Sequence, residues 1–346
     1  MPPSQAKPVS IEAFLEASGP VVDVRSPAEF AQGHIPGAQN LPLFDTDGRA
    51  AVGTAYKQHG RQAAIQLGLE LVGPRLAGLG LQLRHLADGN RLRLHCWRGG
   101  MRSASVAWLA ELQGLEVLLL PGGYKAFRAW VLASFEKSWP LHLLGGRTGT
   151  GKTALLLALQ RRGVAVVDLE GLAHHRGSSF GGLGLPPQPT SEHYENRLAM
   201  ALKPLAAAKA IWLEAESAQV GRCRIPAGLW KGMGDAPVLE IRRPLAERIA
   251  QLVAEYGCQE PAELVAATER IAKRLGPQRT AAALEAIARR DWSLACAAML
   301  DYYDRCYDQE LSRRSTDLQA TIDVGGLEPL QAAETLLSSG LVRSTA

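Results

Sequence analysis

The chain has 346 residues, of which 47% are hydrophobic and 21% charged, and its formal net charge is +4. This length allows two or three domains with sizeable cores, and the small positive charge permits nucleic-acid binding without requiring it. No stretch approaches 18 uninterrupted apolar residues, so we expect no membrane span. Five cysteines without a C-x-x-C pair argue against a zinc ribbon, and with no recognisable leader we expect a cytoplasmic protein.

One cysteine lies in a glycine- and arginine-rich turn, Cys-Trp-Arg-Gly-Gly-Met-Arg-Ser. The apolar run 92–95 predicts a short buried strand before it, and apolar residues at helical spacing predict a helix over 103–112. Cys96 therefore lies where a strand ends and a helix begins, among unpaired backbone N–H groups. Arg98 and Arg102 add positive charge, and both effects favour the nucleophilic thiolate. We predict that Cys96, Arg98 and Arg102 are the catalytic residues.

The segments around this turn show a family pattern. Residues 23–30 read D-x-R-x-x-x-E-F, residues 33–41 read G-H-I-x-G-A-x-N-L, and residues 121–124 form a Pro-Gly-Gly-Tyr turn. Together with the cysteine turn they resemble the rhodanese fold over about residues 8–135. The resemblance implies an α/β domain in which Cys96 carries sulfur or selenium. It also implies that three polar residues hold the turns together and take no part in catalysis: Asp23, Arg25 and His34.

A second anion-binding loop has the full G-x-x-x-x-G-K-[ST] pattern. A predicted strand over 141–144 precedes it and a predicted helix over 153–162 follows, which is the context that this motif requires. Its backbone N–H groups would surround a phosphate or diphosphate, its lysine would neutralise the charge, and its threonine hydroxyl would bind Mg²⁺. We expect no tightly bound cofactor beyond such an ion. The predicted phosphate-binding residues are Gly146, Gly149, Gly151, Lys152 and Thr153.

Two further apolar runs, 164–168 and 210–214, predict strands that each end in an acidic residue. The carboxyl ends of parallel strands lie beside the phosphate site in sheets of this kind, although a polar strand end is the simpler interpretation of either residue. The loops that follow are rich in polar groups. The predicted secondary acidic and substrate-binding set is Asp168, Glu170, Arg176, Ser178, Ser179, Glu214 and Glu216.

The last hundred residues have helical periodicity and carry a cluster of basic side chains. Such a cluster either is the solvated face of a helix or contacts the phosphates of a nucleic acid, in which case its binding would depend on salt. The residues predicted to make such phosphate contacts are Arg270, Lys273, Arg274 and Arg279.

The cysteine loop, the phosphate loop and the segment 168–181, in this order, resemble bacterial tRNA 2-selenouridine synthases, and so does the segment 51–58. The resemblance spans about residues 8–310. It implies that selenium replaces the sulfur of a thiouridine at the wobble position of tRNA. It further implies selenophosphate as the donor and an S-geranylated intermediate made from geranyl diphosphate. The expected partners are tRNA, selenophosphate and geranyl diphosphate, and the oligomeric state is not predicted.

We therefore expect an α/β protein in three parts. A rhodanese-like domain spans 8–137 with an inserted segment at about 44–90, a P-loop NTPase-like parallel-sheet domain spans 138–245, and a helical C-terminal extension spans 246–346. The C-x5-R spacing of the cysteine loop, one residue longer than in most rhodaneses, leaves an alternative. This is a rhodanese-fold cysteine phosphatase or sulfurtransferase fused to a kinase-like P-loop domain. A second alternative is a non-catalytic module in which both loops only hold phosphate.

Overall fold

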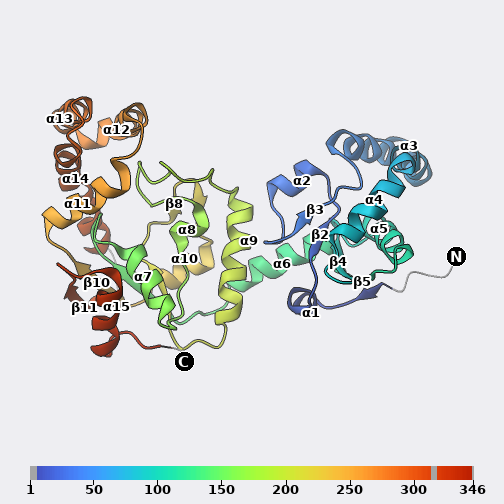
Figure 1. Ribbon diagram of the computed structural model, residues 1–346, viewed down its shortest axis with the longest axis horizontal. Helices are drawn as coiled ribbons and strands as arrows, with labels where there is room; N and C mark the ends of the chain where they lie inside the picture. The colour runs from blue at the N-terminus through green and yellow to red at the C-terminus, as the bar shows by residue number, and fades with distance from the viewer. Residues whose placement is uncertain (1–5, 313–317, 345–346) are drawn as a thin grey trace. The chain divides into compact units, whose positions relative to one another are not determined.

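A computed structural model describes residues 6–312 and 318–344. The chain forms two compact units, residues 1–134 with 195–197 and residues 135–194 with 198–346. Each unit is built on a parallel sheet with helices around it, as the sequence predicts (Figure 1). In the described part of the chain, no helix is long and apolar enough to cross a membrane.

The first unit has a five-stranded sheet with the order β1-β5-β4-β2-β3. Its strands are β1 (Lys7–Pro8), β2 (Val21–Asp23), β3 (Gln39–Asn40), β4 (Arg91–His95) and β5 (Glu116–Leu119). The surrounding helices are α1 (Ile11–Glu16), α2 (Pro27–Gln32), α5 (Met101–Leu112) and α6 (Gly123–Phe135). Side chains alternate along β4, so Leu92 and Leu94 enter the core shared with α5 whereas His95 faces Phe14 and Tyr124.

Three helical elements fill the chain between β3 and β4: α3 (Thr46–Val72), the 3₁₀ turn η1 (Gly73–Arg75) and α4 (Leu76–Leu86). Helix α3 begins after Asp45, whose carboxylate accepts a hydrogen bond from the Gly48 N–H at 2.7 Å. The helix is interrupted at Gly60, whose φ of 84° is outside the helical region. Leu79 and Leu83 of α4 are buried in the core shared with α5. The inserted segment is therefore helical and packs on the sheet domain.

The second unit has a four-stranded parallel sheet with the order β11-β10-β6-β7. These strands are β6 (Leu141–Gly145), β7 (Ile211–Glu214), β10 (Val238–Arg242) and β11 (Leu318–Asp323). Around them lie α7 (Lys152–Arg161), α8 (Leu169–Ala173), α9 (Ser191–Leu202), η2 (Lys203–Leu205), α10 (Ala227–Gly234), α15 (Pro329–Ser338) and a small hairpin of β8 (Gln219–Val220) and β9 (Cys223–Arg224). Leu156 and Leu159 of α7 share a buried core with Ala333 and Leu336 of α15.

The strand predicted over 164–168 is reduced to one bridge, between Val166 and Trp212. Only two backbone hydrogen bonds join this segment to β7, from the Val167 N–H to Trp212 and from the Trp212 N–H to Ala165. The pairing stops there because Asp168 leaves the strand to cap α8, its carboxylate accepting the Gly171 N–H at 2.7 Å.

Four helices lie between the adjacent strands β10 and β11: α11 (Leu245–Tyr256), α12 (Pro261–Leu275), α13 (Pro277–Ala288) and α14 (Trp292–Ser312). The last three share a small apolar core with Phe180, and this core includes Ile271, Leu275, Ile287 and Met299 (Figure 1). The helical character of this region agrees with its periodicity. The periodicity does not predict β11, which returns the chain to the sheet.

Candidate active sites

Cys96 directly follows β4 and precedes α5, where the sequence predicts it. Its side chain is only 2% exposed, and its Sγ lies 3.2 Å from the Ser103 Oγ. That hydroxyl also lies 3.1 Å from the Gly100 carbonyl oxygen, to which it donates. For a thiolate at Cys96, the same hydroxyl hydrogen would instead point to the sulfur. Ser103 is therefore a partner of the cysteine that the sequence analysis did not single out.

The Pro-Gly-Gly-Tyr turn fixes the cysteine loop through backbone hydrogen bonds. The Tyr124 N–H donates to the Cys96 carbonyl at 2.8 Å, and the Lys125 N–H donates to the Trp97 carbonyl at 2.9 Å. The turn and the cysteine loop approach so closely that a Cβ built on Gly123 would lie 2.2 Å from the Cys96 carbonyl oxygen. Gly123 also has a φ of 57°, so both space and backbone conformation require glycine there.

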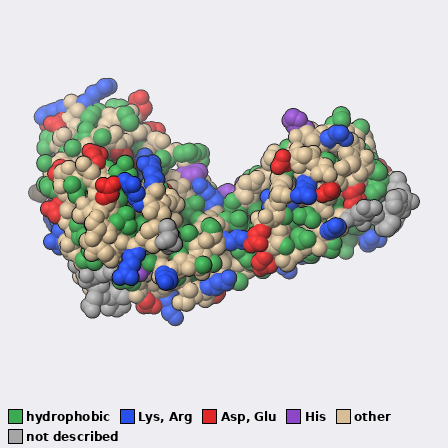
Figure 2. Space-filling view, turned by 60° about the horizontal axis from the view of Figure 1, so that its bottom comes forward, with side chains coloured by type: hydrophobic (Ala, Val, Ile, Leu, Met, Phe, Trp, Pro, Cys, Tyr) green, Lys and Arg blue, Asp and Glu red, His purple; other side chains and the backbone are tan. Residues whose placement is uncertain are grey.

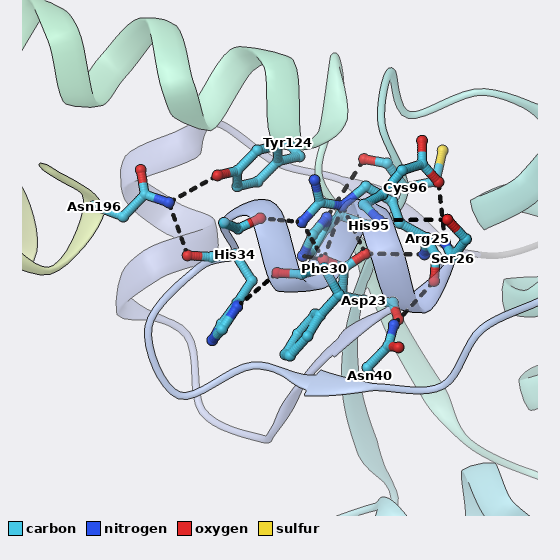
Figure 3. Close-up of polar contacts among 12 residues, drawn as sticks. Asp23, Arg25, Ser26, Phe30, His34, Asn40, His95, Cys96, Tyr124 and Asn196 are labelled. Carbon is cyan, nitrogen blue, oxygen red and sulfur yellow. Dashed lines mark hydrogen bonds and ion pairs between the residues drawn. The ribbon is translucent and has the colours of Figure 1, made fainter. Parts of the chain in front are cut away.

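Asp23 and Arg25 form a buried ion pair beneath this loop (Figure 3). The Arg25 guanidinium donates to the Asp23 carboxylate and to the Gly33 carbonyl, and its carbon lies 3.7 Å from the centre of the Tyr124 ring. His95 lies 3.7 Å from the same carboxylate, and its burial lowers the pKa of the imidazole. These contacts support a scaffolding role for the pair.

The two arginines of the cysteine loop have different surroundings. Arg98 is exposed, whereas Arg102 donates to the Glu29 carboxylate at 2.8 Å, with Arg49 of α3 3.7 Å from that carboxylate. Burial favours the neutral form of Glu29 and is the largest single effect. The hydrogen bonds from Arg102 and from the Ser26 N–H, with the charges of both arginines, outweigh it and lower the pKa of Glu29. Glu29 thus joins the loop to α2 and α3.

The phosphate loop links β6 to α7 as the motif requires. Gly151, with a φ of 86°, is the residue before the helix, so the N–H groups of the first turn of α7 point into the loop. The Lys152 ammonium donates to the Gly146 carbonyl at 2.8 Å, and the Thr153 hydroxyl donates to the Glu170 carboxylate at 2.7 Å. The structure therefore brings the predicted phosphate-binding residues together, beside one residue of the predicted acidic set.

Glu214 is fully buried at the end of β7. Its Oε2 accepts the Leu169 N–H at 3.0 Å, while its Oε1 has no hydrogen-bond partner among the described residues. Burial raises the pKa of Glu214 well above its usual value, and the nearby Asp168 and Glu170 carboxylates raise it further. In the described ranges no group of three or more His, Cys, Asp or Glu side chains is arranged to hold a metal.

The oxygen atoms at this edge nevertheless suit Mg²⁺, which is commonly bound by one or two carboxylates together with substrate phosphates and water. The unpartnered Glu214 Oε1, together with the hydroxyl of Thr153 and the carboxylate of Glu170, is the donor set that fits.

The other predicted substrate residues make contacts within their loops or between these loops and the helices. Arg176 forms an ion pair with Glu255 of α11, and its guanidinium lies 5.5 Å from the centre of the Tyr256 ring. The Ser178 hydroxyl accepts the Phe180 N–H at 3.2 Å, and the Ser179 carbonyl accepts a bond from Arg270 at 2.8 Å. Glu216 lies beside this loop, because a Cβ on Gly177 would be 2.6 Å from its Oε2. These contacts favour a structural role for Arg176 and the two serines.

Two arginines, one within the phosphate loop and one outside it, hold this loop in place. Arg248 of α11 is buried and donates to the Thr148 carbonyl at 2.8 Å and to Asp304 of α14 at 3.0 Å. Arg147, within the loop, donates to Asp308 of α14 at 2.8 Å. Sequence reasoning missed these residues, since their partners lie between 56 and 161 positions away and no local spacing indicates them.

The predicted tRNA residues separate into two groups. Arg270, Lys273 and Arg274 are exposed on α12, at spacings that place them on one face of the helix. Arg279 is on α13, where it forms an ion pair with Asp301. On the face drawn in Figure 2, basic side chains occur in small separate groups with acidic ones between them.

Comparison with known proteins assigns the family. The model described as "Rhodanese-like domain" matches residues 8–129, and the one described as "tRNA 2-selenouridine synthase AAA domain" matches residues 139–291. A tRNA 2-selenouridine synthase from Marinobacter nauticus is 35% identical over 336 residues, which cover 86% of this chain and 90% of that protein. The chain belongs to the tRNA 2-selenouridine synthase family.

Other tRNA 2-selenouridine synthases match to similar extents. The protein from Hydrogenovibrio crunogenus is 36% identical over 350 residues, covering 89% of this chain and 92% of its own. The protein from Cronobacter sakazakii is 42% identical over 277 residues, covering 76% and 72%. The match therefore includes both units, as the resemblance of the two loops predicts.

Proposed function

We propose that this chain replaces the sulfur of a wobble 2-thiouridine in tRNA by selenium, through an S-geranylated intermediate. The observation that carries the proposal is the presence of a cysteine loop and a phosphate loop in one member of this family. Its relatives are named for 2-selenouridine in tRNA. The proposed substrates are tRNA, selenophosphate and geranyl diphosphate.

The first proposed step is alkylation at the phosphate loop. The thione sulfur attacks C1 of geranyl diphosphate, the carbon–oxygen bond breaks, diphosphate leaves, and the base gives up its N3 proton. Negative charge grows on the diphosphate, which Lys152 and the N–H groups at the start of α7 would stabilise. Mg²⁺ held by Thr153, Glu170 and Glu214 would supply further positive charge there. The base sulfur thereby becomes a thioether, which is a better leaving group.

The second proposed step is selenation at the cysteine loop. The selenium of selenophosphate attacks C2 of the base, the C2–sulfur bond breaks, and geranylthiol leaves with a proton. Water then cleaves the selenium–phosphorus bond and phosphate is released. Cys96 and the exposed Arg98 are the residues that would contact the donor. We assign tRNA phosphates to the exposed basic face of α12.

The phosphatase alternative is less well supported. A cysteine phosphatase of the C-x5-R type needs its arginine free to bind phosphoryl oxygens, and here Glu29 already accepts two hydrogen bonds from Arg102. Incubation with phosphate monoesters tests this alternative directly, because a phosphatase would release phosphate in a Cys96-dependent reaction.

The test of the proposed function is nucleoside analysis of tRNA from cells that lack the gene and carry the wild-type or variant chain. We expect 2-selenouridine with the wild type. With Cys96→Ser we expect S-geranyl-2-thiouridine to accumulate without selenation, and with Lys152→Ala we expect 2-thiouridine to remain. Normal 2-selenouridine in the Cys96→Ser strain would refute the assignment of the cysteine loop.

A further inference from the structure

A large groove lies beside Cys96 in the first unit, with a volume of about 1370 Å³. One wall is formed by α3 and the start of α4, and the other by the cysteine loop and α5. Sites for drug-sized ligands usually measure about 300–1,000 Å³. The groove is therefore much larger than a small anion such as selenophosphate requires.

The groove exposes apolar side chains to solvent. Four of the large hydrophobic residues that line it are at least one-third exposed: Tyr56, Leu69, Leu76 and Met101. Ile65 and Trp108 also line it and are half-buried. Apolar side chains gathered in a concave surface indicate a binding site, whereas single exposed ones do not.

The same groove is basic. No acidic residue is found among its described lining residues, and five cationic ones are: Arg49, Lys57, Arg61, Arg98 and Arg102. Glu29 is the ion-pair partner of two of them, Arg49 and Arg102. The Arg61 guanidinium reaches the Met101 sulfur at 3.7 Å, so a cation of one wall meets the apolar surface of the other. This combination suits a ligand that is both anionic and apolar.

The break in α3 shapes this groove. Gly60 has a φ of 84° and a ψ of −176°, which lie outside the helical region. Some residues of 49–57, before the break, and of 61–72, after it, line the groove. Glycine adopts this conformation at little cost, whereas other residues rarely do. The inserted segment therefore presents two helical pieces to one ligand.

We propose that this groove binds the S-alkyl chain and the neighbouring phosphates of the alkylated thiouridine, and so presents C2 of the base to the cysteine loop. The inference rests on the proposed function. The occupant is an RNA strand that carries a prenyl thioether: the prenyl chain lies on Ile65, Leu69 and Leu76, and the phosphates face Lys57 and Arg61. The alkyl group that makes the sulfur a leaving group would then also be the group that the groove recognises, so that the cysteine loop receives the alkylated intermediate in preference to unmodified thiouridine.

The test measures binding of anticodon stem-loop RNAs whose wobble thiouridine carries an S-methyl, S-dimethylallyl or S-geranyl group. Fluorescence anisotropy with the full-length chain, without diphosphate, gives each Kd. Because burial of each extra carbon contributes affinity, we expect the geranyl RNA to bind wild type at least about tenfold more tightly than the methyl RNA. The double variant Leu69→Gln/Leu76→Gln should lose this gain and keep its affinity for the methyl RNA.

The matched control is Leu81→Gln/Leu112→Gln, since these leucines are exposed in the same unit and do not line the groove. It should behave as wild type. A chain-length gain that survives in the Leu69→Gln/Leu76→Gln variant would overturn the proposal, because the alkyl chain would then bind elsewhere. The proposal would also be overturned if the wild type were a dimer, the Leu69→Gln/Leu76→Gln variant were a monomer, and the Kd for RNA did not depend on the length of the alkyl chain. That result would assign the groove to a second copy of the protein.

Selenation assays separate this inference from the proposed function. If the wild-type protein converts S-geranyl RNA to 2-selenouridine but its Kd does not depend on the length of the alkyl chain, the groove proposal alone is refuted. Wild type that shows the chain-length gain, but forms no 2-selenouridine with selenophosphate, would refute the proposed function and leave the groove as an alkyl-RNA binding site.

Discussion

The Nε–H of Arg248 donates to the Thr148 carbonyl at 2.8 Å, which ties helix α11 to the middle of the phosphate loop. The same guanidinium is paired with Asp304 of α14. A loop that binds a diphosphate must hold its N–H groups in fixed directions, and Arg248 holds one of its carbonyls. Two helices outside the phosphate-binding motif therefore determine the conformation of the motif.

We predict that Arg248→Met destabilises the second unit by about 1–3 kcal/mol, because it removes the hydrogen bonds to the half-buried Asp304 carboxylate and leaves it only Arg147, at 3.6 Å. The affinity for inorganic diphosphate should fall as well. Thermal unfolding measures the loss of stability. The transition of the second unit is identified as the one whose midpoint temperature rises when diphosphate is added. Arg289→Met removes an exposed ion pair and should change little. Wild-type diphosphate affinity in folded Arg248→Met would contradict the role of Arg248 in shaping the loop.

Lys152→Ala should weaken the binding of geranyl diphosphate by about ten- to a hundredfold, since a charged hydrogen bond contributes roughly 1.5–3 kcal/mol. Isothermal titration against geranyl diphosphate and inorganic diphosphate measures the change. Lys231→Ala is the control, because that lysine is exposed on α10. Equal affinities for the wild type and Lys152→Ala would show that the loop has another ligand, with ATP as the first to test.

Glu214 should make the stability of the second unit depend on pH. Its pKa is raised in the folded state, so the folded form favours the neutral acid. The stabilisation is fully present below the unfolded pKa, near 4.3, and is lost as the pH rises through the folded pKa. One proton gives a slope of about 1.4 kcal/mol per pH unit within that window. Glu214→Gln should therefore raise Tm relative to wild type at pH 7, and the difference should disappear near pH 4.

Thermal unfolding in EDTA from pH 4 to pH 8 measures this difference. Glu334→Gln, at an exposed position of α15, is the control and should follow the wild-type curve. A constant difference between Glu214→Gln and wild type over the whole pH range would mean that Glu214 does not titrate in this window.

Arg270, Lys273 and Arg274 should account for most of the salt-dependent tRNA affinity of the helical region. Replacing the three by glutamine should weaken all tRNAs alike, because phosphate contacts carry no sequence information. The slope of log Kd against log salt should fall by about 0.7–0.9 for each lost contact. Replacing Arg289, Arg305 and Lys231 makes the same change of net charge elsewhere and should leave the slope unchanged. Arg279→Gln alone should have a small effect, because Asp301 already neutralises it.

The sequence predicts both anion-binding loops because each is a local pattern. Cys96 lies between β4 and α5, and the phosphate loop between β6 and α7, where hydrophobic periodicity places them. Contacts between distant residues were not predicted. The pairing of Arg248 with Asp304 joins residues 56 positions apart, and nothing in the spacing marks either of them.

The groove beside Cys96 could not be predicted from the sequence either. Leu69 and Leu76 look like ordinary core leucines in a helical pattern, and only the structure shows that they are exposed. The kink at Gly60 could not be predicted either, since a glycine within a helical segment does not by itself indicate a break. The strand predicted over 164–168 was too long because the capping role of Asp168 was not recognised.

The position of β11 has a consequence for folding during synthesis. The sheet of the first unit is complete once Leu119 is available, whereas the sheet of the second unit needs Asp323, roughly 200 residues later. At about 5–20 residues per second, the ribosome takes on the order of 10–40 s to make that stretch. In the last part of this interval, after β10 has been made, one edge of β10 lacks its neighbouring strand and the apolar side of α7 lacks α15. The nascent second unit is therefore the part of the chain that most needs protection by chaperones.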